Sequence, residues 1–250
     1  MVVRIYLYYN IEWYPYKILP MYLYIKGHFP RFFEHIIVDS SVNKFFKYMK
    51  LKDYPRWYLE VYPKLAKKLT AKYGDRVWVV IPDYPDDYRE NRIEDNTEKT
   101  LENVVAFIEK CPDVNWLPVI QARFLDIMAF RRACKMYREV LGDYPRIAIG
   151  TLCTRAPEDY AKFCVMATRQ FFPRSWIHVF GPNVRWLRFM KYYVNSIDTV
   201  AYYKPPWHLR GKGVTSMDEY AKEWLKLAKK YIGTYSSKIP SHSLIRSSLR

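Results

Sequence analysis

Glycine is scarce in this 250-residue chain, and glutamine is almost absent. The chain has 8 glycines, and no glycine-rich loop follows its first strand-like segment, which argues against a Rossmann-type nucleotide-binding domain. The two glutamines are Gln121 and Gln170, and a shortage of this heat-labile residue favours a thermophilic source. These shortages leave other α/β architectures open.

Cysteines and long apolar runs are also few. The four cysteines form no C-x-x-C pair and no Cys/His cluster, so we expect no bound metal or cofactor. They are predicted to be reduced, mostly buried thiols: Cys111, Cys134, Cys153 and Cys164. The apolar N-terminus is interrupted by Arg4, Glu12 and Lys17, has no run of about 18 apolar residues, and lacks a signal-peptide cleavage site. The sequence therefore predicts a cytoplasmic protein with no membrane partner.

Positive charge is what the chain has in excess. It carries 41 Lys and Arg against 25 Asp and Glu, a net charge of +16. Such a balance favours a polyanionic partner, nucleic acid first, with an anionic membrane surface as the competing interpretation. The 24 tyrosines are interpreted mainly as packing residues, with base stacking as the alternative role for some of them.

Apolar strand-like segments alternate with amphipathic helical segments through most of the chain. The expected strands are the N-terminal VVRIYLYY and residues 35–41, 76–83, 116–122, 146–152, 176–182 and 196–203; the expected helices are 55–74, 96–110, 125–142, 156–172, 184–194 and 216–233. Strands that are apolar on both faces are typical of a covered parallel sheet.

The predicted fold is α/β, a (β/α)8 TIM-type barrel that is irregular or one strand short, with a doubly wound open sheet as the alternative. The barrel is expected to occupy residues 1–233 as a single domain, followed by a Ser-rich basic tail at 234–250. The oligomeric state stays open, with a homodimer as one option.

Polar residues and glycines stand at the predicted carboxyl ends of the strands, where a barrel of this type has its active site. They are Asp39, Asp83, Gln121, Gly150, Thr151, Gly181 and, within the last strand, Asp198. Converging carboxylates suit a general acid/base and a nucleophile for transfer at an acetal carbon. The alternative for each single acid is a helix N-cap. The acids that follow Asp83, up to residue 95, are interpreted as a solvated loop, with a metal site as the alternative, although their spacing matches no known metal-binding loop.

The order of six short segments resembles the tRNA-guanine transglycosylase superfamily, and most closely its DNA-modifying paralogues, which exchange guanine for a 7-deazaguanine. The segments are VDSS (38–41), PDYPDD (82–87), LPVIQ (117–121), IAIGTL (147–152), HVFGPN (178–183) and SIDT (196–199). Together they cover about residues 35–210, and each is short, so their specificity lies in their order.

This resemblance implies roles for the residues at the strand ends. Asp39 and Ser40 match the pair that lies over the base and acts in proton transfer. Asp83 matches the acid that reads the base edge, and Gln121 with the segment 150–152 completes base recognition. Asp198 matches the nucleophile that attacks the anomeric carbon. The base would be flipped out of the stack, and two displacements would retain the configuration of the sugar.

Basic and aromatic residues near the expected mouth are the candidates for contacts with nucleic acid. They are Arg123, Arg155, Lys204, Trp207, Arg210 and Lys212. The last four belong to YYKPPWHLRGKG (202–213), for which an ordinary basic loop is the alternative interpretation. The hypothesis is thus a base-exchange enzyme acting on DNA or tRNA, with DNA favoured and a 7-deazaguanine as the incoming base.

Two departures from the tRNA enzymes support a second hypothesis. Those enzymes have a second acid in an Asp-x-Phe-Asp arrangement, where this chain has Ala201, and their cysteine-rich zinc motif is absent here. Both features favour a non-catalytic nucleic-acid-binding protein on a degenerate barrel. A third hypothesis, a glycosidase or nucleoside hydrolase that uses the same acids, leaves the charge of +16 without a role.

Overall fold

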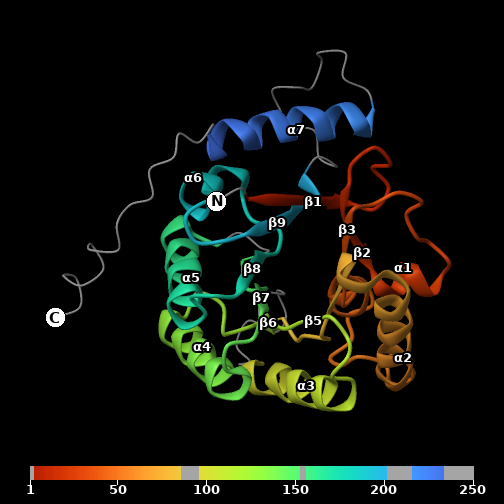
Figure 1. Ribbon diagram of the computed structural model, residues 1–250. Helices are drawn as coiled ribbons and strands as arrows, with labels where there is room; N and C mark the ends of the chain where they lie inside the picture. Colours follow the sequence, from red (N-terminus) through yellow and green to blue (C-terminus); the bar gives the residue numbers. More distant parts are fainter. Residues whose placement is uncertain (1–2, 86–95, 153–155, 202–215, 234–250) are drawn as a thin grey trace.

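The computed structural model describes residues 3–85, 96–152, 156–201 and 216–233 (Figure 1). Within this part, nine parallel strands form one sheet in the order β5-β4-β3-β2-β1-β9-β8-β7-β6. They are β1 (Arg4–Tyr8), β2 (Tyr16–Pro20), β3 (His35–Asp39), β4 (Val77–Val80), β5 (Trp116–Leu117), β6 (Val119–Ile120), β7 (Arg146–Ile149), β8 (Trp176–Val179) and β9 (Ser196–Thr199). The sheet curls into a nearly closed barrel, so the predicted α/β TIM-type architecture is confirmed.

The two edges of the sheet meet at Pro118, which alone separates β5 from β6. The Leu117 carbonyl accepts a hydrogen bond from Ile81 N at 3.2 Å, and the Pro118 carbonyl accepts one from Ala148 N at 2.8 Å. Consecutive carbonyls therefore face β4 on one side and β7 on the other. Because proline has no N–H to donate, it fits a position where the chain passes from one neighbour to the next.

Helices surround the strands (Figure 1). They are α1 (Met21–Ile25), α2 (Arg56–Tyr73), α3 (Thr97–Lys110), α4 (Ile127–Leu141), α5 (Glu158–Phe171), α6 (Leu187–Met190) and α7 (Met217–Ile232), with a π-helical turn η1 (Asn43–Tyr48) and the 3-10 turns η2 (Gly74–Arg76) and η3 (Val184–Trp186). A capping box at Ser216 and Glu219 opens α7. Helix α2 runs through Pro63 as one continuous helix.

Two regions differ from the sequence-based expectation. Strand β2 was not predicted, because Pro15 precedes it, Pro20 is its last residue and Lys17 lies inside it. With β2 present the barrel is not one strand short; it is irregular because a loop, not a helix, connects β1 to β2. The helix expected over 184–194 is only the short pair η3 and α6.

Lys17 explains how this loop is held. Its side chain is 1% exposed, and its ammonium donates to the carbonyls of Ile11 at 2.8 Å, Glu12 at 3.3 Å and Tyr9 at 3.4 Å. Burial lowers the pKa of Lys17. A charge buried in this way is tolerated because each ammonium proton has an acceptor.

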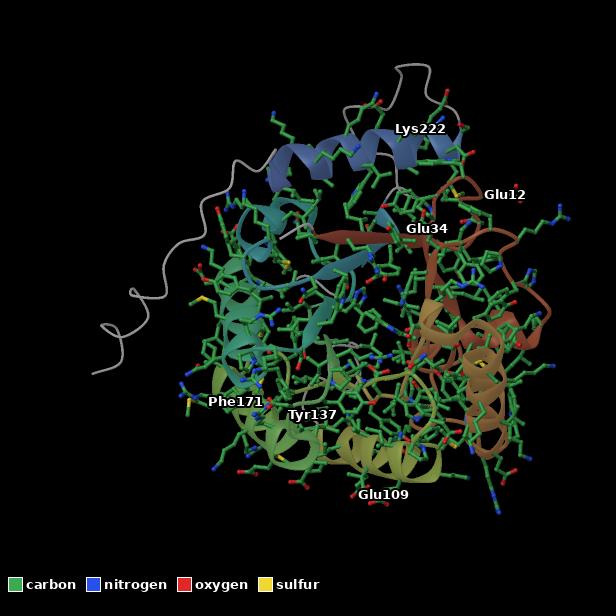
Figure 2. All side chains as sticks on the ribbon, in the orientation of Figure 1. Glu12, Glu34, Glu109, Tyr137, Phe171 and Lys222 are labelled. Atoms are coloured by element: carbon green, nitrogen blue, oxygen red, sulfur yellow. The ribbon has the colours of Figure 1, made fainter. Side chains whose placement is uncertain are left out.

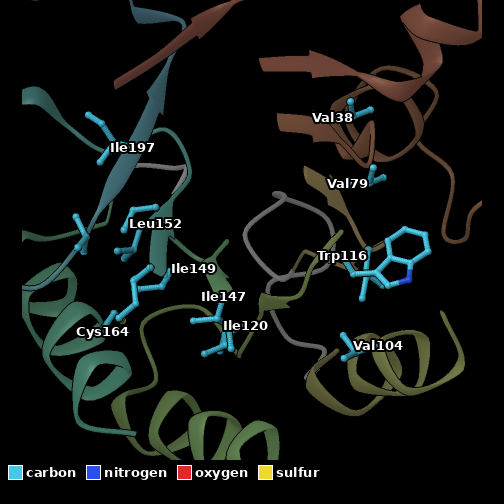
Figure 3. Close-up of a cluster of buried hydrophobic side chains, with 14 of the residues drawn as sticks. Val38, Val79, Val104, Trp116, Ile120, Ile147, Ile149, Leu152, Cys164 and Ile197 are labelled. Atoms are coloured by element: carbon cyan, nitrogen blue, oxygen red, sulfur yellow. The ribbon is translucent and has the colours of Figure 1, made fainter. Parts of the chain in front are cut away.

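The main core lies between the strands and the helices (Figure 3). On one side of the barrel it joins Val38, Val79 and Trp116 to Val104 of α3. Tyrosines add polar anchors to this layer: the hydroxyls of Tyr58, Tyr62 and Tyr137 donate to the carbonyls of Ser40, Val80 and Val119. Figure 2 shows Tyr137 on the inner side of α4, whereas Glu109 lies on the outer side of α3. These tyrosines are packing residues, as the sequence analysis expected of most.

Cys111, Cys134 and Cys164 are buried free thiols, and Cys153 lies outside the described residues. None of the helices in the described ranges is long and apolar enough to cross a membrane.

Candidate active site at the barrel mouth

Three carboxylates meet at the carboxyl ends of the strands. Asp39 ends β3, Asp83 follows β4, and Asp198 lies in β9. Asp83 and Asp198 are 5% and 8% exposed, and Asp39 is partly exposed. The charges of Asp83 and Asp198 both raise the pKa of Asp39, after the larger effect of burial. The three acids therefore share one electrostatic environment, although they come from distant parts of the chain.

Asp83 is held by two side chains, one on each carboxylate oxygen. The Ser40 hydroxyl donates to Oδ1 at 2.6 Å, and the Gln121 amide Nε2 donates to Oδ2 at 2.6 Å. The Asp83 carbonyl in turn accepts from the Tyr54 hydroxyl at 3.0 Å. Burial raises the pKa of Asp83, and the bonds from Ser40 and Gln121 oppose that shift. Ser40, predicted to contact substrate, is fully buried here and supports Asp83.

Asp39 lies beside a strained turn. Ser41 has φ of 68°, in the left-handed region that is costly for a residue with a side chain. This conformation lets Ser41 N donate to Asp39 Oδ2 at 3.1 Å, and Ser41 Oγ accepts from Tyr22 N at 2.9 Å. Burial, followed by repulsion from Asp83, raises the pKa of Asp39 to about 7. A carboxyl with such a pKa can both donate and accept a proton near neutral pH.

Asp198 is held through one oxygen. Gly181 N donates to Oδ1 at 2.8 Å, and Nε2 of His178 lies 3.5 Å from the same oxygen. Gly181 has φ of 52°, a conformation in which glycine avoids the strain that a side chain would bring. No hydrogen bond from the described residues reaches Oδ2. One oxygen of Asp198 is therefore fixed, and the other is available to an incoming group.

Gln121, Gly150 and Thr151 form the side of the mouth next to Asp83. Two of their buried polar atoms, Gln121 Oε1 and Thr151 Oγ1, have no hydrogen-bond partner in the structure as described. A Cβ on Gly150 would lie 2.7 Å from Gln121 Cδ and 2.9 Å from Val119 Cγ1, so only glycine fits there. Buried polar groups are rarely left unpaired. A ligand with donors along one edge would satisfy these atoms.

None of the three acids caps a helix within the described ranges. Their partners are Ser41 N two residues along, the side chains of Ser40 and Gln121, and Gly181 N across two strands. The helix that follows β4 starts after Asn96. The helix-cap alternative therefore does not account for the position of these carboxylates.

The predicted nucleic-acid contacts are only partly visible. Arg123 is exposed in the loop after β6, at the mouth. Arg155, Lys204, Trp207, Arg210 and Lys212 lie outside the described residues, as do the acids between 86 and 95. In the described ranges, no cluster of three or more His, Cys, Asp or Glu side chains could hold a metal ion.

A basic and aromatic segment that was not predicted from the sequence lies directly after β3. Lys44, Lys47 and Tyr48 belong to η1, and Tyr48 and the following Met49 are 71% and 47% exposed. This segment starts two residues beyond Ser41, so it belongs to the rim of the same mouth. The signal was present in VNKFFKYMKLK (42–52), which has four lysines and a tyrosine next to an acid-ended strand.

Comparison with known proteins adds no assignment, because no protein-family model matches the chain and no curated protein matches it.

Proposed function

We propose that the protein is a base-exchange glycosyltransferase that replaces guanine in nucleic acid, DNA in preference to tRNA, by a 7-deazaguanine. The observation that carries this proposal is that three neighbouring acids differ in their hydrogen-bond partners and in their electrostatic environment. Asp83 has both oxygens engaged, Asp39 has a pKa near neutrality, and Asp198 has one oxygen held and the other open. A base reader, a proton carrier and a nucleophile need these three different environments.

The reaction would proceed by two displacements. Asp198 Oδ2 attacks C1′ of the flipped nucleotide, the C1′–N9 bond breaks, and its electron pair leaves with the guanine. Protonated Asp39 gives its proton to the departing base. The incoming 7-deazaguanine then loses its N9 proton to Asp39 and attacks C1′, so the bond to Asp198 breaks and the carboxylate is restored. Each displacement inverts C1′, and the product retains the original configuration.

Recognition of the base would use the side of the mouth that has unpaired atoms. Gln121 Oε1 and Thr151 Oγ1 are buried acceptors, and Asp83 is an acceptor next to them. Guanine and 7-deazaguanines carry an amine and a ring N–H along one edge, which is the complementary pattern. Gly150 has no side chain, so a flat ring can approach the backbone on this side of the mouth.

The nucleic acid itself would be held by the charge of the chain. The net charge of +16 favours a polyanion, and Arg123, Lys47 and Tyr48 are exposed around the mouth. Cations would contact phosphates, and an exposed tyrosine ring can stack on an unpaired base. The non-catalytic alternative shares this surface, but three repelling carboxylates in one buried site are costly to keep without a reaction.

The test is base exchange with covalent trapping. The protein and isotope-labelled guanine are incubated with duplex DNA, with single-stranded DNA or with tRNA in separate reactions. The label retained in each polymer is then counted. We expect label in DNA, and its loss by more than about a thousand-fold in Asp198→Asn, which removes the nucleophile. Asp159→Asn, the same change at an exposed acid of α5, is the matched control and should exchange normally.

Three results would contradict the proposal. Salt-sensitive binding without label in any polymer would favour the non-catalytic binding protein. A covalent adduct that persists in Asp198→Asn would exclude Asp198 as the nucleophile. Release of free base without exchange would indicate a hydrolase.

A further inference from the structure

A buried histidine lies directly beneath Asp198, and the reaction above gives it no role. His178 is fully buried in β8, and its Nε2, which makes no hydrogen bond in the structure as described, lies 3.5 Å from Asp198 Oδ1. On its other side, His178 Nδ1 lies 2.9 Å from the Ser196 hydroxyl, which is also 2.8 Å from Trp176 Nε1. These side chains come from β8 and β9, where His178 and Ser196 are direct partners in the sheet register.

The direction of the hydrogen bonds follows from the chemistry of the groups. An indole N–H can only donate, so Ser196 Oγ accepts from Trp176. The serine oxygen has a second lone pair, so the indole alone does not set the direction of its contact with His178 Nδ1. The carboxylate oxygen 3.5 Å from Nε2 favours the proton on Nε2, which leaves Nδ1 to accept the serine proton. A neutral imidazole has one donor and one acceptor nitrogen, so the remaining proton is on Nε2, the nitrogen that faces Asp198.

We propose that Trp176, Ser196 and His178 form a positioning chain that fixes the Nε2–H tautomer of His178 and directs this N–H at Asp198 Oδ1. Together with Gly181 N, it holds one oxygen of the carboxylate, so that Oδ2 points to the reacting carbon. His178 has no contact with substrate in this role; it acts through Asp198. The inference rests on the proposed function for its effect on rate, but the tautomer itself does not.

The first test measures rate, with a matched pair of substitutions. His178→Asn places an amide near the Nδ1 position and removes the donor to Asp198, whereas His178→Gln can place an amide N–H near the Nε2 position. We expect the single-turnover rate of covalent adduct formation to fall about 10- to 100-fold in His178→Asn, the usual range for residues that orient a reacting group. Binding of the nucleic acid should change less than about two-fold, and His178→Gln should recover most of the rate.

His35 supplies the control for packing. It is also buried inside the barrel, its Nδ1 also has a hydroxyl partner, Tyr6 at 3.0 Å, and its Nε2 also makes no hydrogen bond, but within the described residues no carboxylate lies beside that Nε2. His35→Asn should therefore leave the adduct rate unchanged. Equal rates in His178→Asn and the unaltered protein would overturn the proposal, and so would equal losses in His178→Asn and His178→Gln.

The second test needs no activity, and its main readout uses the unaltered protein. Nitrogen NMR of histidine-labelled protein reads the tautomer of each imidazole, with Ser196→Ala used to assign and perturb His178. We expect a neutral Nε2–H tautomer that becomes mixed in Ser196→Ala. An Nδ1–H tautomer in the unaltered protein would overturn the chain. If no exchange is found but the Nε2–H tautomer is, the proposed function fails while the positioning chain stands.

Discussion

The two ends of the barrel interior differ in charge and in the way their polar groups are paired. At the amino ends of the strands, cations stack on aromatic rings: the Arg4 guanidinium lies 4.6 Å from the Tyr16 ring, and that of Arg146 lies 5.1 Å from Trp78. At the carboxyl ends, Asp39 and Asp198 are carboxylates that repel each other. Strand β3 contributes to both ends, with His35 at its start and Asp39 at its end, because every second residue of a strand points to the same face.

This difference shows where the barrel gains stability and where it loses some. The ring centroids of His35 and Trp78 lie 4.4 Å apart, and those of Trp78 and Trp176 lie 5.5 Å apart. The amino end of the barrel interior, here called the floor, is therefore filled by favourable ring contacts. Burial, with the charges of Arg4 and Arg146, lowers the pKa of His35 to about 3, which keeps this imidazole neutral. The mouth instead keeps charges that are costly to bury, which is typical of an active-site end.

The largest expected effect comes from removing charge at the mouth. Asp39 has a folded pKa of about 7 against an ordinary 3.8, so the folded chain holds this proton more tightly. Stability should therefore fall as pH rises from about 4 to about 7, by up to about 4 kcal/mol, and level off above. Asp39→Asn should remove most of this slope and be the more stable protein at pH 8.

Urea unfolding between pH 4.5 and 8 measures this difference. The slope contributed by Asp83 is present in both proteins, so the comparison isolates Asp39. Parallel curves for the two proteins would show that Asp39 has an ordinary pKa, and would weaken its role as proton carrier.

The next effect tests the floor. Trp78→Ala removes the ring that contacts His35, Trp176 and Arg146, and should cost about 3 kcal/mol of unfolding free energy. Trp78 is not itself a member of the chain of Trp176, Ser196 and His178 that reaches Asp198, so base exchange below the melting temperature should change little. Trp57→Ala is the control, since Trp57 is 48% exposed on α2 and should cost less than about 0.5 kcal/mol. A large loss of activity in folded Trp78→Ala would mean that floor and mouth are coupled.

The sequence predicted the mouth better than the floor, for a physical reason. An acid at the end of an apolar strand can be recognised from the sequence alone. Asp39, Asp83 and Asp198 could therefore be chosen as site candidates, and their common edge of the sheet could be inferred. The positions of Arg4, Trp78 and Trp176 become meaningful only when the strands are placed in register. The same holds for His178 and Ser196, which are partners only because β8 and β9 are neighbours.

Strand β2 was missed for a related reason. Lys17 argues against a buried strand in any single-sequence interpretation, and its three carbonyl partners come from a loop whose shape the sequence does not reveal. The rim lysines of η1 were overlooked although they stand next to Asp39 in the chain, because the segment 202–213 has a richer mixture of rings and cations. The tripartite arrangement of acids was therefore predictable, and most of its supporting contacts were not.

A smaller effect tests the fit of the mouth. Gly150→Ala would push its methyl group into the Gln121 amide and displace the group that donates to Asp83. We expect a loss of about 2 kcal/mol in stability and at least about ten-fold in exchange. Adding Gln121→Ala should recover part of the stability, because the clash is relieved, but none of the exchange, because the base-reading amide is gone. Recovery of both would show that Gln121 has no part in recognition.

The smallest effect concerns the anchors that hold the strands at the mouth. Tyr137 is fully buried and donates its hydroxyl to the Val119 carbonyl at 2.6 Å, two residues before Gln121. Tyr137→Phe keeps the ring and removes only this bond, so we expect a loss of about 1 kcal/mol and an exchange rate within about two-fold of normal. Tyr192→Phe, at a ring 51% exposed, is the matched control and should be neutral in urea unfolding. A Tyr137→Phe protein of normal stability but much slower exchange would show instead that the anchor sets the position of Gln121, and would extend the active site into α4.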